Sequence, residues 1–292
     1  MNRFVNNLCL VLLSAVISTL SVSAQPSAPE ETARTSNLYL ELASSLNYDS
    51  LRAIMADDAQ FFDPTGDVFN GPVSQGVITG ADRIVRIQRG WGLTGVEFTP
   101  AVSFYVGEYA VHRGTYKAQF QNAANWTEIP FVTIHHVKDG KIQERTDFGE
   151  YINSFSLGGA FDENTMWTEV VADQYLQAYF DGDLQVQREL SSEDIIFQDP
   201  TAQVFGPPSG QLFEGAEELM TRRAQIYEVI SDFGFDVESS FYANHHAVYM
   251  GYAKYTISGS SYRQPAVFVV EVRDQKVTRH WDFVDYTVGP VQ

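Results

Sequence analysis

The chain has a single cysteine and few basic residues for its length. Of its 292 residues, 19 are Lys or Arg and 37 are Asp or Glu, so the formal net charge is −18. Such a polyanion has no electrostatic attraction to phosphate backbones or anionic lipid, which argues against nucleic-acid binding. The sequence also lacks a phosphate-binding loop, a dinucleotide fingerprint, a zinc-protease motif and a nucleophile elbow. We therefore expect no cofactor and no metal.

The segment 1–24 is typical of a secretory signal peptide. Arg3 supplies the positive end, residues 8–20 are mostly apolar, and Val22-Ser23-Ala24 places small residues at the cleavage site. The only cysteine, Cys9, lies inside this segment, so the mature chain has no thiol, which excludes disulfides, thiolate catalysis and cysteine-ligated metals. No later hydrophobic run is long enough for a membrane helix. We expect a secreted or periplasmic protein that is soluble once the signal is removed.

Beyond residue 36 the chain repeats itself once, at a nearly constant offset. FFDPTGDVF at 61–69 matches FQDPTAQVF at 197–205, and six further blocks keep nearly the same offset. This period is that of a whole domain, because solenoid units are much shorter. The predicted division is a signal peptide (1–24), a flexible leader (25–36), a first domain (37–153), a linker (154–166) and a second domain (167–288).

The pattern within each copy predicts an α+β domain. Helical periodicity comes first, at 37–46 and 167–180, followed by a second short helix and by a third helix after a glycine. Strand-like alternation then dominates, and Asp139-Gly140 is a hairpin signal. The strands expected in the first copy are residues 96–106, 109–120, 129–137 and 142–151. We expect four or five antiparallel strands in a curved sheet that wraps over the helices.

Three features of each copy stand out: the order of elements, the Asp-Gly-Lys-Ile hairpin before a strand ending in Asp-Phe, and the Asp-Pro-Thr step. In these features the chain resembles the nuclear transport factor 2-like superfamily, and within it the SnoaL-like polyketide cyclases and ketosteroid isomerases. Residues 56–59 leading to Asp63 are similar to the isomerase segment that carries the catalytic base. The isomerase's second oxyanion donor falls where this chain has Val132 and Val267, which argues against a ketosteroid isomerase.

The resemblance implies an architecture as well as a chemistry. It implies two cone-shaped domains in tandem, each with N-terminal helices packed in a curved antiparallel sheet. Members of the superfamily commonly pair through the outer faces of their sheets. A tandem chain can form such a pair within itself, so we expect an intrachain pseudo-dimer that is monomeric in solution.

The resemblance makes Asp63 and Asp199 candidate bases, with Tyr39 and Tyr175 as donors to the oxygen on which negative charge develops. Each tyrosine precedes its aspartate by the same spacing in the two copies. An aspartate at the mouth of an aromatic cavity is poorly solvated, which raises its pKa and improves it as a base. The alternative for each aspartate is a turn that ends a strand, in which the carboxylate accepts backbone hydrogen bonds. Each tyrosine can equally belong to the edge of the core.

Asp147 and Asp282 form a second candidate group on the final strand of each copy. A carboxylate in an otherwise apolar strand needs a partner, because burying it unpaired is costly. His280 shares a strand face with Asp282 and offers an acid/base pair or an ion pair. The first copy has Arg145 at that place, which favours a fixed salt bridge to Asp147. SnoaL-like cyclases are similar in keeping an aspartate on this strand as the acid/base group, and the alternative is a solvated or Arg-paired carboxylate.

Together with these residues, the resemblance implies an exported, cofactor-free enzyme that moves protons on a small apolar carbonyl or polyketide-like molecule, as an isomerase, cyclase or dehydratase. The second copy is the stronger candidate because it keeps Tyr175, Asp199, His280 and Asp282 together. The competing hypothesis is a non-catalytic module that holds a hydrophobic ligand or a partner protein. The two differ in whether aspartate and tyrosine face one shared cavity.

Overall fold

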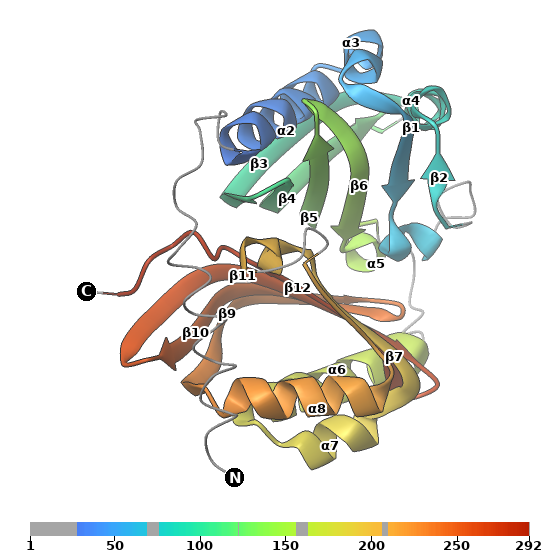
Figure 1. Ribbon diagram of the computed structural model, residues 1–292. Helices are drawn as coiled ribbons and strands as arrows, with labels where there is room; N and C mark the ends of the chain where they lie inside the picture. Colours follow the sequence, from blue (N-terminus) through green and yellow to red (C-terminus); the bar gives the residue numbers. More distant parts are fainter. Residues whose placement is uncertain (1–27, 69–75, 122, 156–162, 206–209, 292) are drawn as a thin grey trace.

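The computed structural model describes residues 28–68, 76–121, 123–155, 163–205 and 210–291 (Figure 1). The predicted signal peptide, residues 1–24, lies outside these ranges. Among the helices of the described residues, none is both long and apolar enough to cross a membrane.

The first domain has helices on one side of a six-stranded sheet. Its helices are α2 (Ala28–Ser44), α3 (Tyr48–Ala53), α4 (Ala81–Gly90) and α5 (Tyr151–Ser154), with a short 3₁₀ helix η1 (Pro64–Val68). Its strands are β1 (Met55–Phe62), β2 (Ile78–Thr79), β3 (Leu93–Val106), β4 (Tyr109–Phe120), β5 (Thr127–Lys138) and β6 (Lys141–Gly149).

The second domain repeats this order. Its helices are α6 (Glu163–Asp181), α7 (Leu184–Leu190) and α8 (Ala216–Tyr227), with the 3₁₀ helix η3 (Pro200–Phe205). Its strands are β7 (Ser191–Asp199), β8 (Gln211–Glu214), β9 (Ile230–Ala243), β10 (His246–Ile257), β11 (Ser260–Arg273) and β12 (Lys276–Val284). The prediction of two tandem α+β domains is therefore confirmed.

Each sheet has the same strand order. It runs β2-β1-β6-β5-β4-β3 in the first domain and β8-β7-β12-β11-β10-β9 in the second, so the two copies keep separate sheets. The sheets are mixed, because β1 pairs in parallel with β6 and β7 with β12. The four long strands that the sequence predicts in the first copy do pair antiparallel, but the parallel pairing of β1 with β6 was not predicted. Periodicity along one strand carries no information about the direction of its neighbour.

The first helix begins earlier than the sequence predicts. α2 starts at Ala28, so most of the predicted flexible leader is helical. Three polar residues of that segment are buried: the Oγ1 atoms of Thr32 and Thr35 donate to backbone carbonyls, and Ser36 Oγ bonds to two histidines. Because these inward-facing residues are polar, the apolar spacing that marks a buried helix face is missing from the sequence. Similarly, α6 starts at Glu163, within the predicted linker.

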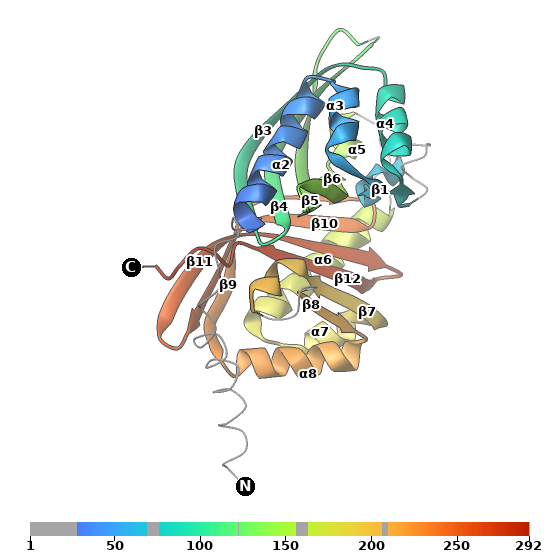
Figure 2. The same cartoon turned by 45° about the horizontal axis from the view of Figure 1, so that its top comes forward.

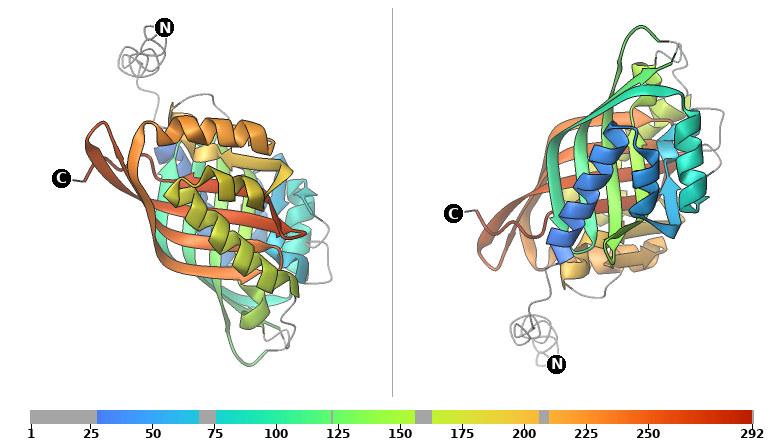
Figure 3. Two further views of the ribbon diagram at one scale, coloured as in Figure 1. Left: turned by 90° about the horizontal axis from the view of Figure 1, so that it is seen from below. Right: turned by 90° about the horizontal axis from the view of Figure 1, so that it is seen from above.

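The two sheets pack back to back, with helices α2, α3 and α4 of the first domain and α6, α7 and α8 of the second on the outside (Figures 1 and 2). The views from below and above show the helices of one domain and then of the other covering their sheet (Figure 3). Side chains from the outer faces of both sheets form one buried apolar cluster, which we call the seam core. It contains Phe104, Val106, Val111, Val132, Ile134, Phe148, Phe241, Ala243, Val248, Met250, Val267, Val269 and Phe283.

The place of two valines in the seam core corrects one sequence argument. Val132 and Val267, matched to an oxyanion donor of the isomerases, point away from the helices and into the seam core. Their strand neighbours face the domain interiors instead. The valines therefore carry no information about which donors an interior site contains.

Candidate active site

The second domain encloses a large apolar cavity between its helices and its sheet. The cavity has a volume of about 650 Å³, and its walls are mainly aromatic and aliphatic side chains from β7, α8, β9 and the strands beyond them. Residues 288–290, which follow the last strand, form part of the wall. The polar groups on this wall include two carboxylates, Asp199 and Asp282, together with the hydroxyls of Tyr179 and Tyr286.

Asp199 is the last residue of β7, and its carboxylate is fully engaged. Its Oδ1 accepts from Thr201 Oγ1 at 2.6 Å and from the Ala202 backbone N–H at 3.0 Å, and its Oδ2 accepts from the Tyr286 hydroxyl at 2.6 Å. Burial, followed by the negative charge of Asp282, raises the pKa of Asp199 to about 7 although these hydrogen bonds oppose the shift. The carboxyl group therefore keeps its proton to a higher pH than an exposed aspartate does.

Asp282 lies on β12, which also brings His280 to the same face. Asp282 Oδ2 accepts from the Tyr179 hydroxyl at 2.9 Å. Asp282 Oδ1 lies 2.6 Å from His280 Nε2, although the N–H is poorly aligned for a hydrogen bond. Among the described residues no lysine or arginine forms an ion pair with Asp282. This carboxylate is thus held by neutral groups.

His280 has a fixed tautomer because an arginine lies behind it. Arg223 Nη2 is 2.9 Å from His280 Nδ1, and a guanidinium can only donate. Nδ1 is therefore the acceptor, and the ring proton of the neutral histidine is on Nε2, which faces Asp282. Burial lowers the pKa of His280, and the charge of Arg223 adds to this while Asp282 opposes it. Arg223 is itself fully buried and also donates to Gln187 Oε1.

The predicted pairing of Tyr175 with Asp199 is not the one that the structure makes. The Tyr175 hydroxyl lies 3.3 Å from His280 Nδ1, and the hydroxyl that reaches Asp199 is that of Tyr286. Of the predicted residues, Tyr175, His280 and Asp282 thus belong to one network. Asp199 reaches the same cavity through a separate set of hydrogen bonds.

The first domain repeats the Asp199 arrangement but not the Asp282 arrangement. Asp63 accepts from Thr65 Oγ1, the Gly66 N–H and the Tyr151 hydroxyl, and burial followed by the charge of Asp147 raises its pKa to about 7. Asp147, however, is bound by Arg145 through both carboxylate oxygens, one of them 2.8 Å from Nε.

Tyr39 completes the cluster around Arg145. Its hydroxyl accepts from Arg145 Nη1 at 2.7 Å, as the hydroxyl of Tyr175 approaches His280 in the second domain. Tyr39 is a fully buried residue with a structural partner. The predicted fixed salt bridge on Asp147 therefore describes this domain.

Comparison with known proteins identifies the fold that carries this site. The SnoaL-like domain matches the chain twice, at residues 38–145 and 172–280. The chain belongs to the SnoaL-like family. No curated protein matches the chain.

Solved structures similar to one SnoaL-like domain of the chain include three relatives with named activities. A putative SnoaL-like polyketide cyclase from Shewanella denitrificans is 18% identical, with a TM-score of 0.37, 41% of this chain covered and 91% of that one. An epoxide hydrolase of the LEH-like type from M. tuberculosis is 12% identical, with a TM-score of 0.36 and coverages of 42% and 85%. A putative ketosteroid isomerase from Kribbella flavida is 19% identical, with a TM-score of 0.35 and coverages of 44% and 85%.

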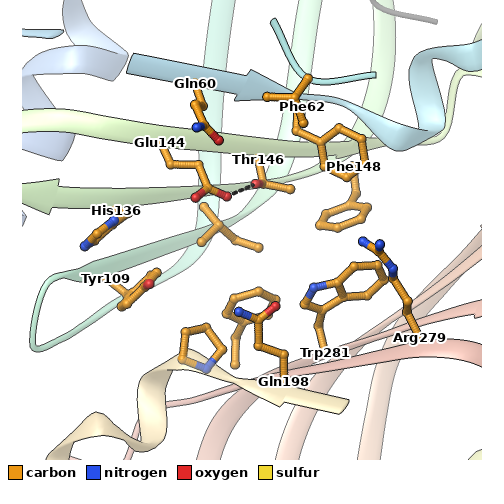
Figure 4. A pocket seen from close by; sticks show the side chains of 14 residues that line it. Gln60, Phe62, Tyr109, His136, Glu144, Thr146, Phe148, Gln198, Arg279 and Trp281 are labelled. Atoms are coloured by element: carbon orange, nitrogen blue, oxygen red, sulfur yellow. Dashed lines mark hydrogen bonds between the residues drawn. The ribbon is translucent and has the colours of Figure 1, made fainter. Parts of the chain in front are cut away.

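A second, smaller cavity lies at the seam between the two SnoaL-like domains (Figure 4). It has a volume of about 230 Å³ and takes residues from both sheets, among them Phe148 and Glu144 of β6 and Trp281 and Arg279 of β12. Thr146 donates to Glu144 at 3.1 Å on one wall. The Glu144 carboxylate and the Arg279 guanidinium come from the sheet faces that point away from each domain's own helices. This cavity is therefore separate from the Asp199–Asp282 site.

Sequence reasoning missed Arg223, Tyr179 and Tyr286. Arg223 could have been found, because it lies four residues from both Leu219 and Tyr227 and therefore falls on the apolar face of α8. The repeat also aligns Tyr286 with Tyr151, which marks a tyrosine kept in both copies. Tyr179 carries no such signal, since it follows Tyr175 by one helical turn and reads as core.

Proposed function

We propose that the second SnoaL-like domain is a cofactor-free enzyme that transfers protons on small apolar carbonyl compounds, as an isomerase, cyclase or dehydratase. The observation that carries this proposal is the presence of two carboxylates, Asp199 and Asp282, on the wall of one otherwise mostly apolar cavity. Two carboxyl groups with different environments can divide the roles of acid and base between them, as they do in ketosteroid isomerases.

The contacts favour Asp282 as the base. In the described part of the chain its carboxylate accepts one hydrogen bond, from the Tyr179 hydroxyl to Oδ2, whereas Asp199 accepts three. Oδ1 of Asp282 is therefore open to take a proton. Asp199 has the raised pKa and holds a proton through part of the neutral range. In this assignment the C–H proton moves to Asp282, and the O–H of Asp199 donates to the carbonyl oxygen as negative charge develops there. These roles reverse those that the sequence suggested for Asp199.

The first domain lacks a free base in this scheme. Arg145 occupies both oxygens of Asp147, so proton uptake by Asp147 would break a buried ion pair. We therefore propose that its role is structural, with the outer face of its sheet packed against the catalytic domain in the seam core. We further propose that the protein is exported and monomeric, since this packing covers the sheet face through which the family commonly pairs.

Hydrogen–deuterium exchange tests the proposal without knowledge of the natural product. The protein is incubated in D₂O with a panel of cyclic ketones of one to three rings, and loss of the α-proton signal is followed by NMR. We expect Asp282→Asn to slow exchange by on the order of 10²- to 10⁴-fold, because a general base is removed at constant size. Asp199→Asn keeps a hydrogen-bond donor in place, so its exchange rate should fall by a smaller factor.

Asp147→Asn is the matched control in the first domain and should leave the exchange rate of the folded protein unchanged; circular dichroism checks that it is folded, because this variant loses a buried ion pair. Equal rates in the parent protein and Asp282→Asn would contradict the assignment of the base. If no ketone exchanges faster than in buffer, while a fluorescent apolar ketone binds the parent and Asp282→Asn equally well, the non-catalytic binding module is the correct interpretation.

A further inference from the structure

In each domain a buried arginine lies inside, between the helices and the sheet, at a comparable place, but the two arginines come from opposite sides of that interior. In the first domain Arg145 extends from strand β6, and its Cζ lies 5.2 Å from the ring centre of Tyr39 and 5.0 Å from that of Phe61. In the second domain Arg223 extends from helix α8, and its Cζ lies 5.4 Å from the Tyr175 ring and 5.2 Å from the Phe197 ring. The rings in each comparison are equivalent residues of the repeat.

Each domain has a different, uncharged side chain at the position where the other domain has its arginine. At the α4 position equivalent to Arg223 the first domain has Gln88, and at the β12 position equivalent to Arg145 the second has His280. Gln88 Nε2 donates to the Tyr39 hydroxyl at 3.2 Å. Both domains therefore keep a buried guanidinium beside the same aromatic pair, but the arginine that supplies it lies on the strand in the first domain and on the helix in the second.

The element that carries the arginine decides which group the guanidinium binds. From β6, Arg145 reaches the carboxylate two residues along its own strand and forms an ion pair with Asp147. From α8, Arg223 reaches the far nitrogen of the histidine and leaves the carboxylate to the histidine's other nitrogen. The order in the second domain is therefore Arg223, His280 and then Asp282, with neutral imidazole between the two charges.

We infer that Arg223 is the positioning residue of the active domain: it fixes the proton of His280 on Nε2, so that an N–H and not a lone pair faces Asp282 Oδ1 at 2.6 Å. This inference rests on the proposed function for its effect on rate, but not for its effect on the histidine. Tyr179 supports the arrangement, because its ring lies 4.2 Å from the Arg223 Cζ and its hydroxyl donates to Asp282.

The groups packed around His280 come from five elements, so its behaviour can be related to named neighbours. They are Tyr175 and Tyr179 of α6, Arg223 of α8, Phe197 of β7, Phe268 of β11 and Asp282 of β12. Arg223 is the cation among them and Asp282 the anion. Removal of Arg223 therefore removes both the donor to Nδ1 and the positive charge that disfavours the imidazolium.

Nitrogen-15 NMR of histidine-labelled protein reads this arrangement directly. His280→Gln assigns the signal, and the parent protein should show Nδ1 as an acceptor and Nε2 as a protonated nitrogen across neutral pH. In Arg223→Met we expect a changed Nδ1 signal, because that nitrogen loses its donor, and a His280 pKa above that of the parent. Arg222→Met is the matched control, because Arg222 is the exposed neighbour on the same helix. An unchanged His280 signal in Arg223→Met would overturn the inference.

Two additional measurements separate the possible failures. If Arg223→Met does not fold, Arg223→Gln takes its place, since glutamine is the residue at the equivalent position of the first domain. This variant should keep the Nε2–H tautomer and still raise the His280 pKa. An unchanged His280 titration would contradict the role of Arg223. In the ketone exchange assay, Arg223→Met should lower kcat by on the order of 10²-fold, as expected for a misplaced base, with a smaller change in KM because Arg223 also lies on the cavity wall. The expected NMR change without any exchange activity in the parent would reject the proposed function and leave the tautomer assignment standing.

Discussion

The Asp-Pro-Thr turns of the two domains have the same hydrogen bonds, whereas the groups around the final-strand aspartates differ. The tyrosine hydroxyl lies 2.6 Å from the aspartate Oδ2 in both copies. The threonine hydroxyl accepts from a backbone N–H at 2.8 Å in the first copy and at 2.9 Å in the second. By contrast, Asp147 is locked by an arginine, and Asp282 is contacted by a histidine and a tyrosine. The constant part has the features of a structural element, and the variable part is where the copies can differ in chemistry.

The comparison predicts that one substitution has different consequences in the two domains. Asp147→Asn leaves the buried guanidinium of Arg145 without its counter-charge, and this should lower the free energy of unfolding by about 3–5 kcal/mol. Asp282→Asn disturbs neutral donors and should cost about 1–3 kcal/mol. Chemical denaturation of the parent and both variants at neutral pH measures the difference.

A matched variant controls for the size of the effect. Asp139→Asn lies at the exposed β5–β6 turn, where asparagine tolerates the positive φ of 53°, and should change stability little. If Asp147→Asn and Asp282→Asn destabilise the protein equally, the contrast between the locked and the free carboxylate is wrong.

The second prediction concerns pH and treats the domains as alike. The pKa values of Asp63 and Asp199 rise from 3.8 to about 7, because both are buried and each lies near a second aspartate. The folded protein thus binds more protons than the unfolded chain between about pH 4 and 7. Stability contributed by each group is present below about pH 4 and is lost as the pH rises through about 7, with a slope of about 1.4 kcal/mol per pH unit for each group.

Denaturation of the parent, Asp63→Asn and Asp199→Asn at intervals from pH 4 to 8 tests this slope. Each single variant should remove one group's contribution to the pH dependence of the free energy of unfolding, and the double variant should remove both contributions. Profiles that run parallel to that of the parent would show that the two carboxyls have ordinary pKa values in the folded protein.

Local patterns were sufficient to predict much of this fold. The alternation in 109–120 predicts β4 with its observed bounds, and Asp139-Gly140 does form a hairpin, with φ of 53° and 68°. These features depend on neighbours in sequence. The tandem repeat added the domain count, since a domain-sized offset between matching blocks requires two similar folding units.

The site was harder to predict because its contacts join distant segments. Arg223 and His280 are 57 residues apart, and Tyr286 and Asp199 are 87 apart. Spacing along the chain associated Tyr175 with Asp199, but the hydroxyl that reaches Asp199 comes from beyond the last strand. The start of α2 was missed for a related reason: Ser36 is buried through hydrogen bonds to His112 and His135, which come from strands far along the chain.

The smallest expected effect tests whether the turn is equally structural in both copies. Thr65 and Thr201 each donate to the neighbouring aspartate and accept a backbone N–H, from Gly149 and Val284 respectively. Valine has nearly the same shape without the hydroxyl, so Thr65→Val and Thr201→Val should each leave buried groups unsatisfied and cost about 1–3 kcal/mol.

The two threonine costs should agree within a few tenths of a kcal/mol, because the hydrogen bonds are the same. The two sites lie in different domains, so the costs should also add in the double variant. A Thr201→Val protein that loses ketone exchange at unchanged stability would instead show that the turn of the second domain acts in the chemistry. The comparison would then extend to Asp199 itself, whose partner Thr201 would help set the acid.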